Sequence, residues 1–300
     1  MNILITGASG LIGRALTREL GELGHQVYAM SRRDDMAAFY WQETQPQHWE
    51  IRWDESINID AVVHLAGESI GSMRWSAAKK QRIYDSRIDT TRALVNHLQH
   101  LQTPPQVLLS ASAIGFYGEG GESDKDENSA PGDDFLANLA QEWERLANQA
   151  SVAGIRVLNL RTGLVLSAQG GALATMLPPF KMGVGGRLGS GQQWMSWISL
   201  DDMVAALVFL LNHPDAHGPV NLVSPQPIRN IELTKVLAQT LKRPALCHMP
   251  TFAVKALFGE MGELLLLSSI RVRPTRLQAL GYTFQDGDFT AALQASLQTP

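Results

Sequence analysis

The sequence predicts an α/β fold, a doubly wound parallel sheet followed by a smaller C-terminal α/β lobe. Short apolar runs alternate with longer helix-like stretches, an order typical of parallel strands joined by helices. The apolar runs are continuous, as expected for strands buried on both faces of a sheet. These patterns hold as far as residue 161, so we expect one unit over residues 1–161 and a smaller lobe, partly interleaved with it, over residues 162–300.

The individual elements follow from local patterns. Gly24 ends the first helical stretch, Pro104 ends the second, and a polar segment with Trp41, Trp49 and Trp53 precedes the third apolar run. We expect strands at residues 3–5, 26–30, 61–65, 107–112, 155–160 and 220–223. We expect helices at residues 11–23, 76–101, 135–150, 201–211 and 231–241.

The composition excludes several classes of protein. The 300 residues carry 25 Lys+Arg against 29 Asp+Glu, a net charge of −4, and 45% of them are apolar, which suffices for a globular core. The near-neutral balance argues against a nucleic-acid partner, since phosphate binding calls for a basic excess. The one cysteine, Cys247, excludes an internal disulfide framework and a multi-cysteine metal site, and the eight histidines lack metal-ligand spacing.

No membrane or targeting segment is expected. Residues 1–13 are apolar, but they lack the basic start of a signal peptide and are interrupted by glycines. Every later apolar run falls far short of the roughly 20 residues that cross a bilayer. We therefore expect a soluble, cytoplasmic protein without a membrane partner, which a single cysteine also fits.

A glycine-rich loop lies where the first strand passes into the first helix. Gly7 permits a tight turn, Gly10 lets backbone N–H groups approach a pyrophosphate, and Gly13 lets the helix pack closely on the strand. The N-terminus of the helix then faces the phosphates with unpaired N–H groups. The loop therefore predicts a dinucleotide site whose residues are Gly7, Ser9, Gly10, Leu11, Ile12 and Gly13.

The end of the second strand discriminates between two dinucleotides. An acidic residue there would favour NAD, because it binds the ribose 2′-hydroxyl. This strand ends instead in Ser31, Arg32 and Arg33, and guanidinium groups pair with a 2′-phosphate. We therefore expect NADP rather than NAD. The alternative is a solvated pair of arginines that Asp34 and Asp35 neutralise.

Motifs along the chain resemble the short-chain dehydrogenase/reductase superfamily in its extended, sugar-nucleotide-epimerase-like form. The superfamily motifs lie at residues 6–13, 64–67, 110–118 and 197–202. A resemblance to an atypical branch, the epimerase family that includes bacterial proteins described as nucleoside-diphosphate-sugar epimerases, lies at residues 161–166, 176–180, 189–192, 273–277 and 281–284. The resemblance covers essentially the whole chain and implies a Rossmann-like fold with NADP at the carboxyl ends of the strands.

The resemblance also implies roles for individual residues. Leu65, Ala66 and Gly67 would line the adenosine and nicotinamide-ribose region of the cofactor. Ser112 would be the catalytic serine, which polarises a substrate carbonyl or hydroxyl. The alternative for Ser112 is a hydroxyl that caps a turn at the end of its strand.

The sequence departs from the superfamily at the proton relay. The motif Tyr-x-x-x-Lys, in which the lysine lowers the pKa of the tyrosine, occurs nowhere in the chain. Aligning Glu144 with the glutamate usual near this helix puts Leu136 at the tyrosine position and Ala140 at the lysine position. A further superfamily asparagine is replaced by Arg87.

Other titratable groups are candidates to replace the relay. Tyr117 closely follows Ser112 and is our second catalytic candidate, Arg87 would supply a positive charge, and Glu68 would act as a base. Each also has a structural interpretation: a turn-packing aromatic for Tyr117, a helix-surface or cofactor contact for Arg87, and a helix-start carboxylate for Glu68. We count Glu68 and Arg87 among the cofactor-binding residues.

The leading hypothesis is an NADP-dependent oxidoreductase or sugar-nucleotide epimerase of atypical mechanism, acting on a small polar substrate that is either free or linked to a nucleotide. Residues 183–191, with Arg187, resemble a substrate-covering loop or form a flexible surface loop. The helix over residues 77–98 either pairs with a second copy, giving a homodimer, or packs on the sheet. The alternative function is a non-catalytic NADP-binding redox sensor or regulatory protein.

Overall fold

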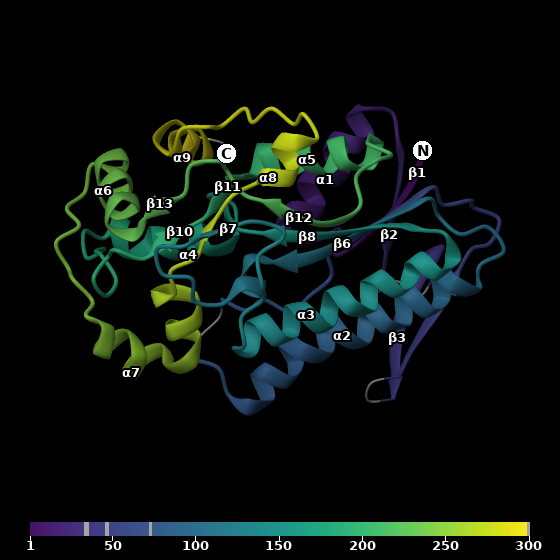
Figure 1. Ribbon diagram of the computed structural model, residues 1–300, viewed down its shortest axis with the longest axis horizontal. Coiled ribbons are helices and arrows are strands. Elements are labelled where there is room, and N and C mark those ends of the chain that lie inside the picture. Colours follow the sequence, from purple (N-terminus) through teal and green to yellow (C-terminus); the bar gives the residue numbers. More distant parts are fainter. Residues whose placement is uncertain (33–35, 46–47, 72–73, 299–300) are drawn as a thin grey trace.

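A six-stranded parallel sheet forms the centre of the protein (Figure 1). The structure is a computed structural model that describes residues 1–32, 36–45, 48–71 and 74–298. The strands of the sheet are β1 (Asn2–Thr6), β2 (Gln26–Met30), β5 (Ala61–His64), β6 (Val107–Ala113), β8 (Arg156–Thr162) and β12 (Gly218–Leu222). They lie in the order β12-β8-β6-β5-β1-β2, and every neighbouring pair is parallel. The doubly wound parallel sheet predicted from the sequence is confirmed.

The direction of winding reverses between β1 and β5. From β1 the chain passes through α1 (Leu11–Glu22) to β2 on one side, and it later returns to β5 on the other side of β1. The carboxyl ends of β1 and β5 therefore form a topological switch point, where sheets of this kind bind ligands. The four inner strands, β1, β5, β6 and β8, are largely buried on both faces, as the continuous apolar runs predict: Ile3, Leu4 and Ile5 are all 0% exposed.

Helices cover both faces of the sheet (Figure 1). The helices α1 and α5 (Leu200–Asn212) pack on one face, and α2 (Ala77–His100) and α3 (Phe135–Asn148) pack on the other. The side-chain oxygens of Ser76 and Asp134 accept backbone N–H groups at the starts of α2 and α3. These caps fix where the two expected helices begin.

The tryptophan-containing segment after β2 folds as a hairpin that we did not predict. It consists of β3 (Phe39–Gln45) and β4 (His48–Trp53), which pair antiparallel. Phe39 and Trp41, two positions apart, are each 1% exposed, because alternate side chains of a strand point to the same face. A half-buried strand with a polar end lacks the continuous apolar run that marks the buried strands of the central sheet.

The smaller lobe is built from short strand pairs and the remaining helices. Its strands pair as β9 with β11, β10 with β13, and β7 with β14. They are β7 (Asp124–Lys125), β9 (Leu164–Leu166), β10 (Trp194–Met195), β11 (Trp197–Ser199), β13 (Ile228–Arg229) and β14 (Arg271–Val272). The helices are α4 (Gly171–Lys181), α6 (Asn230–Leu241), α7 (Thr251–Met261), the π-helix η3 (Gly262–Leu267), α8 (Thr275–Ala279) and α9 (Phe289–Gln298). Short 3₁₀ helices follow β6 and α3, namely η1 (Ile114–Tyr117) and η2 (Gln149–Ala153).

Residues after 162 contribute to both parts of the molecule. The strand β12 belongs to the central sheet and α5 covers it, whereas α4 and α6 lie in the smaller lobe (Figure 1). The boundary expected between residues 161 and 162 stays a prediction. None of the helices in the described ranges is long and apolar enough to cross a membrane.

The helix α7 connects the smaller lobe to the first turn of α2 and to the segment that precedes it. Arg74 Nη1 donates to the carbonyl oxygen of Ala256 at 3.2 Å, and Lys80 Nζ lies 2.8 Å from Glu260 Oε1. Gly259 interrupts α7 with a φ of 58°, and a Cβ at Gly259 would lie 3.0 Å from Arg74 Nε. Only glycine therefore fits this bend beneath the Arg74 side chain.

Candidate functional site

Two glycines of the loop are required by the packing of the protein itself. A Cβ on Gly7, whose φ is +72°, would lie 2.9 Å from both the backbone nitrogen of Ala66 and the carbonyl carbon of Leu65. A Cβ on Gly13 would lie 2.3 Å from the carbonyl oxygen of Gly7. Neither position has room for a side chain, so the loop rests directly on the turn that follows β5. This contact forms the base of the crevice at the switch point.

Gly10 has different surroundings. It is exposed, and the nearest atom to a Cβ built there is the carbonyl oxygen of Gly7 at 3.2 Å. It is the N-cap residue of α1, and no side chain caps this helix. The first N–H groups of α1, beginning at Leu11 and Ile12, therefore have no helical partner and carry the positive end of the helix dipole. This open surface fits a phosphate group, and a side chain at Gly10 would fill it.

A buried polar triad holds the ends of β1 and β5 against α2. Thr6 Oγ1 accepts the N–H groups of Leu65 at 3.1 Å and Ala66 at 3.2 Å, and it lies 2.7 Å from His64 Nδ1. His64 Nε2 lies 2.9 Å from Thr91 Oγ1. Burial lowers the pKa of His64 to about 4, so the imidazole is neutral at pH 7 and each of its nitrogens has a hydroxyl partner.

Arg87 lies beneath the turn that follows β5. Its Nη2 donates to the carbonyl oxygen of Glu68 at 3.1 Å, and its Nη1 donates to that of Ile83 at 3.1 Å. The guanidinium carbon would be 3.2 Å from a Cβ on Gly67 and is 5.2 Å from the ring centre of Trp143. Burial lowers the pKa of Arg87 to about 10, which leaves it charged at pH 7. A fixed positive charge therefore lies beside Gly67.

The remaining residues expected to contact a cofactor have separate environments. Glu68 Oε1 accepts from Lys79 Nζ at 2.6 Å, and this hydrogen bond lowers the pKa of Glu68 and keeps it ionised. Ser31 follows the end of β2 and bridges to β3, and Arg32 beside it is exposed. Arg33 lies outside the described residues.

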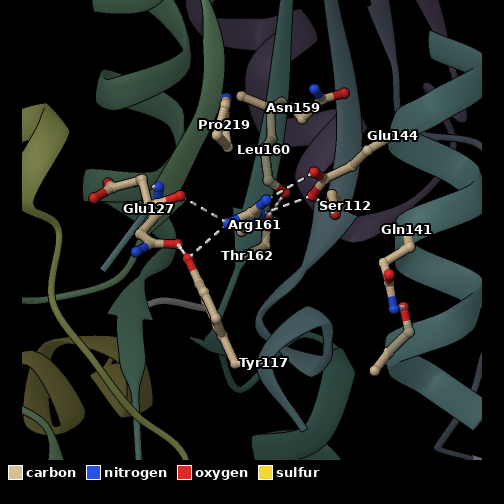
Figure 2. Close-up of polar contacts among 12 residues, drawn as sticks. Ser112, Tyr117, Glu127, Gln141, Glu144, Asn159, Leu160, Arg161, Thr162 and Pro219 are labelled. Atoms are coloured by element: carbon tan, nitrogen blue, oxygen red, sulfur yellow. Dashed lines mark hydrogen bonds and ion pairs between the residues drawn. The ribbon is translucent and has the colours of Figure 1, made fainter. Parts of the chain in front are cut away.

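Ser112 and Tyr117 belong to one network centred on Arg161 (Figure 2). Ser112 Oγ donates to Glu144 Oε1 at 2.7 Å, and Arg161 forms a bidentate ion pair with Glu144 at 2.8 and 2.9 Å. Arg161 Nη1 donates to Tyr117 Oη at 3.0 Å, and Tyr117 in turn donates to Asn221 Oδ1 at 2.7 Å. The structure thus brings the two catalytic candidates together, but around an arginine that we did not predict.

The network is closed to solvent. Its side chains are buried, with 2% of Tyr117 and 4% of Arg161 exposed. Burial raises the pKa of Tyr117 to about 12, so the phenol is protonated at neutral pH. Both candidate hydroxyls already donate to partners within the protein. Their catalytic roles stay predictions.

Leu136 and Ala140, which we aligned with the tyrosine and lysine of Tyr-x-x-x-Lys, also have apolar surroundings. A Cβ on Gly115 would lie 3.3 Å from Leu136 Cβ, so Leu136 packs on the turn after β6, and Ala140 is 3% exposed.

Arg161 is a functional candidate that we did not predict from the sequence. It could have been found as a charged residue at the end of an apolar strand, because a buried charge needs a partner. Within the described ranges, no group of His, Cys, Asp and Glu side chains is placed to hold a metal ion.

A parallel, doubly wound sheet with a glycine loop at its switch point is the architecture of the dinucleotide-binding α/β proteins. Residues 3–223 match the model of the NAD dependent epimerase/dehydratase family, and the chain belongs to this family. Residues 249–296 match a domain of unknown function (DUF1731). The resemblance to the epimerase family, inferred from the motifs, is confirmed.

Similar proteins cover the whole chain. Epimerase family protein Mb2239 of Mycobacterium bovis is 40% identical over 99% of this chain and 98% of its own length. The human epimerase family protein SDR39U1 (isoform 2), crystallised with NADPH, is 31% identical with a TM-score of 0.89, and each chain covers 100% of the other. The nucleoside-diphosphate sugar epimerase from Corynebacterium glutamicum is 32% identical with a TM-score of 0.78, over 99% of this chain and 58% of that one.

We predict that His64 makes the protein less stable in mild acid. The pKa of His64 is about 4 in the folded protein against a reference of 6.5, so the unfolded chain binds more protons between these pH values. The free energy of unfolding should fall by about 2 kcal/mol between pH 7 and pH 5 through this residue. Urea unfolding at both pH values measures the change.

The His64→Gln variant should lose this part of the pH dependence. The matched control is His48→Gln, at an exposed position of β4, which should keep it. Equal pH dependence of the two variants would contradict the role given to His64.

Proposed function

We propose that the protein binds NADP(H) in the crevice between the carboxyl ends of β1 and β5, and that it is an oxidoreductase or epimerase of atypical mechanism. The observation that carries the proposal is the open face at Gly10, set between two glycines that the protein's own packing requires. The NADPH in the crystallised human relative supports the choice of NADP. When bound, NADPH supplies a hydride.

The proposed contacts follow from the positions of the glycine loop and of the turn after β5, and from the sequence that follows β2. The N–H groups after Gly10 would hold the pyrophosphate, and residues 65–67 would border the adenosine and the nicotinamide ribose. Arg32 and Arg33, with Ser31 beside them, would pair with the 2′-phosphate. Arg87 would hold the turn between β5 and α2 in place from below.

Ser112 and Tyr117 stay our candidates for proton transfer, but the hydroxyl group of each already has a hydrogen-bond partner within the protein. Ser112 donates to Glu144 and Tyr117 donates to Asn221, so either hydroxyl must exchange a partner before it reaches a substrate. Arg87 needs no such exchange, because its charge already lies beside Gly67. Negative charge that develops on a substrate oxygen near Gly67 would be stabilised by this guanidinium.

The substrate that we propose is a small polar molecule, either free or linked to a nucleotide, and the proposed compartment is the cytoplasm. We propose no nucleic-acid or membrane partner. A homodimer through α2 stays a prediction, since apolar residues of α2 such as Leu94 and Leu98 pack against the sheet.

A second candidate function is a non-catalytic NADP-binding sensor. The observation that favours it is the state of the groups available for proton transfer. The two relay positions carry the hydrocarbon side chains of Leu136 and Ala140, and both candidate hydroxyls donate within the protein. A protein of this kind would bind the cofactor without turning over a substrate.

Replacing Gly10 with valine should abolish NADPH binding without unfolding the sheet, because the side chain fills the face left open for the pyrophosphate. Calorimetric titration with NADPH measures the loss. The matched control is Gly21→Val on the same helix, where a Cβ meets nothing within 4 Å, and it should bind normally. Unchanged NADPH affinity in Gly10→Val would remove the proposed cofactor site.

The double variant Arg32→Ala/Arg33→Ala should bind NADPH roughly ten- to a hundredfold more weakly, because a charge-assisted contact with the 2′-phosphate is worth about 1.5–3 kcal/mol. Its affinity for NADH should change little, since NADH lacks this phosphate. Titrating both cofactors against the unmodified protein and the variant gives the comparison. Equal loss for the two cofactors would show that these arginines do not read the 2′-phosphate.

Turnover separates the two candidate functions. We expect the unmodified protein to oxidise NADPH with a member of a panel of carbonyl compounds, or to convert a sugar nucleotide that product analysis detects. Ser112→Ala should then lower kcat by about 10²–10⁴-fold while leaving NADPH affinity intact. If the protein binds NADPH but converts no member of either panel, the sensor is the better account.

A further inference from the structure

A hollow of about 650 Å³ lies on the outer side of α6, in the smaller lobe. Its walls are the exposed face of α6, the segment that follows this helix, and Arg187 from the loop before β10. Its volume is within the range of small-molecule sites, which is roughly 300–1,000 Å³. None of the described residues that we expect to hold the cofactor lines it.

Basic side chains dominate the charge of this hollow. Arg187, Lys235, Lys242 and Arg243 line it together with His248, and no aspartate or glutamate of the described ranges does. In the part of the chain that the structure describes, none of the four Lys and Arg groups has a carboxylate within 4.0 Å. Like charges around one concave surface repel each other, so an anion that enters is attracted by all of them.

The end of α6 explains part of this cluster but not all of it. Lys242 and Arg243 follow the last residue of α6 directly, and the negative end of the helix dipole stabilises cations there. Lys235 lies nearly two turns earlier, and Arg187 comes from a segment far away in the sequence. Helix capping therefore does not account for these two cations facing the same hollow.

The floor of the hollow is apolar and held by backbone contacts. Ile231, Ala238 and Ala245 line it. The carbonyl oxygen of Gly189 accepts from His248 Nε2 at 2.7 Å, and a Cβ on Gly186 would overlap the carbonyl oxygen of Cys247. The two segments that carry Arg187 and His248 are thus packed against each other, which gives the cations a fixed frame.

We propose that this hollow binds a small phosphorylated molecule whose phosphate group meets the four cations and whose apolar or aromatic part rests on the aliphatic floor. A nucleoside diphosphate has this chemistry and a suitable size. The proposal does not rest on the proposed function, because it uses different residues from those of the cofactor crevice.

The test uses the full chain with Gly10→Val, so that the cofactor loop does not contribute, and calorimetric titration with ADP and with inorganic pyrophosphate at low salt. We expect saturable binding of ADP, weaker binding of pyrophosphate, and a loss of affinity as salt is raised. In the same background, Lys235→Glu/Arg243→Glu should weaken ADP binding at least tenfold. The control, Arg52→Glu on the distant hairpin, should bind ADP as before, and circular dichroism checks that each variant is folded.

Several outcomes would overturn the proposal. Absence of ADP binding would do so, as would equal binding by Lys235→Glu/Arg243→Glu and by Arg52→Glu. Binding that is present only when Gly10 is intact would assign phosphate recognition to the cofactor loop instead. Saturable binding of an acidic polypeptide or an oligonucleotide, without binding of ADP or pyrophosphate, would assign the hollow to a macromolecular anion.

Discussion

The close contact between the glycine loop and the turn after β5 is the constraint on which the rest of the structure depends. Gly7 and Gly13 have no room for a Cβ, and so β1, α1 and the end of β5 converge at backbone distance. Thr6 Oγ1 then accepts the backbone N–H groups that this approach would bury, and His64 Nδ1 in turn contacts the Thr6 hydroxyl. Backbone atoms form the base of the crevice, so the fold fixes its shape. The first N–H groups of α1 remain available to bind a ligand.

The Arg161 network is a buried cluster of charged and hydroxyl groups in a chain that lacks the motif Tyr-x-x-x-Lys. Glu144 lies one helical turn beyond Ala140 on α3, and Arg161 is the register partner of Ser112 on the neighbouring strand. The bidentate pair compensates two buried charges, and removing either partner would leave the other uncompensated. Tyr117 and Asn221 extend the contacts from η1 to β12. The network therefore joins α3 and the sheet, and it employs both hydroxyls in doing so.

The parts of this structure that the sequence predicts are those set by neighbours along the chain. Ile3–Ile5 is a strand because its residues are apolar on both faces, and the loop at Gly7 follows from its position between a strand and a helix. The partners of Arg161 were not predictable in this way. Glu144 is separated from it by 17 residues and Tyr117 by 44, and Tyr117 meets Asn221 across 104. These contacts depend on strand order and register, which local sequence patterns do not determine.

The sequence gives the net charge of the protein, but only the fold determines where the charged side chains lie. The chain is acidic overall, at −4, yet the fold gathers cations from separate segments around the hollow beside α6, and it buries Arg87 beneath a turn. The electrostatic potential at a surface site depends mainly on charges within about a Debye length, roughly 8–10 Å at ordinary salt. More distant carboxylates contribute little, because salt screens them. A near-neutral total therefore excludes a chain that is basic throughout. It does not exclude local anion sites, which is why the arginines and lysines have to be placed in space before their partners can be inferred.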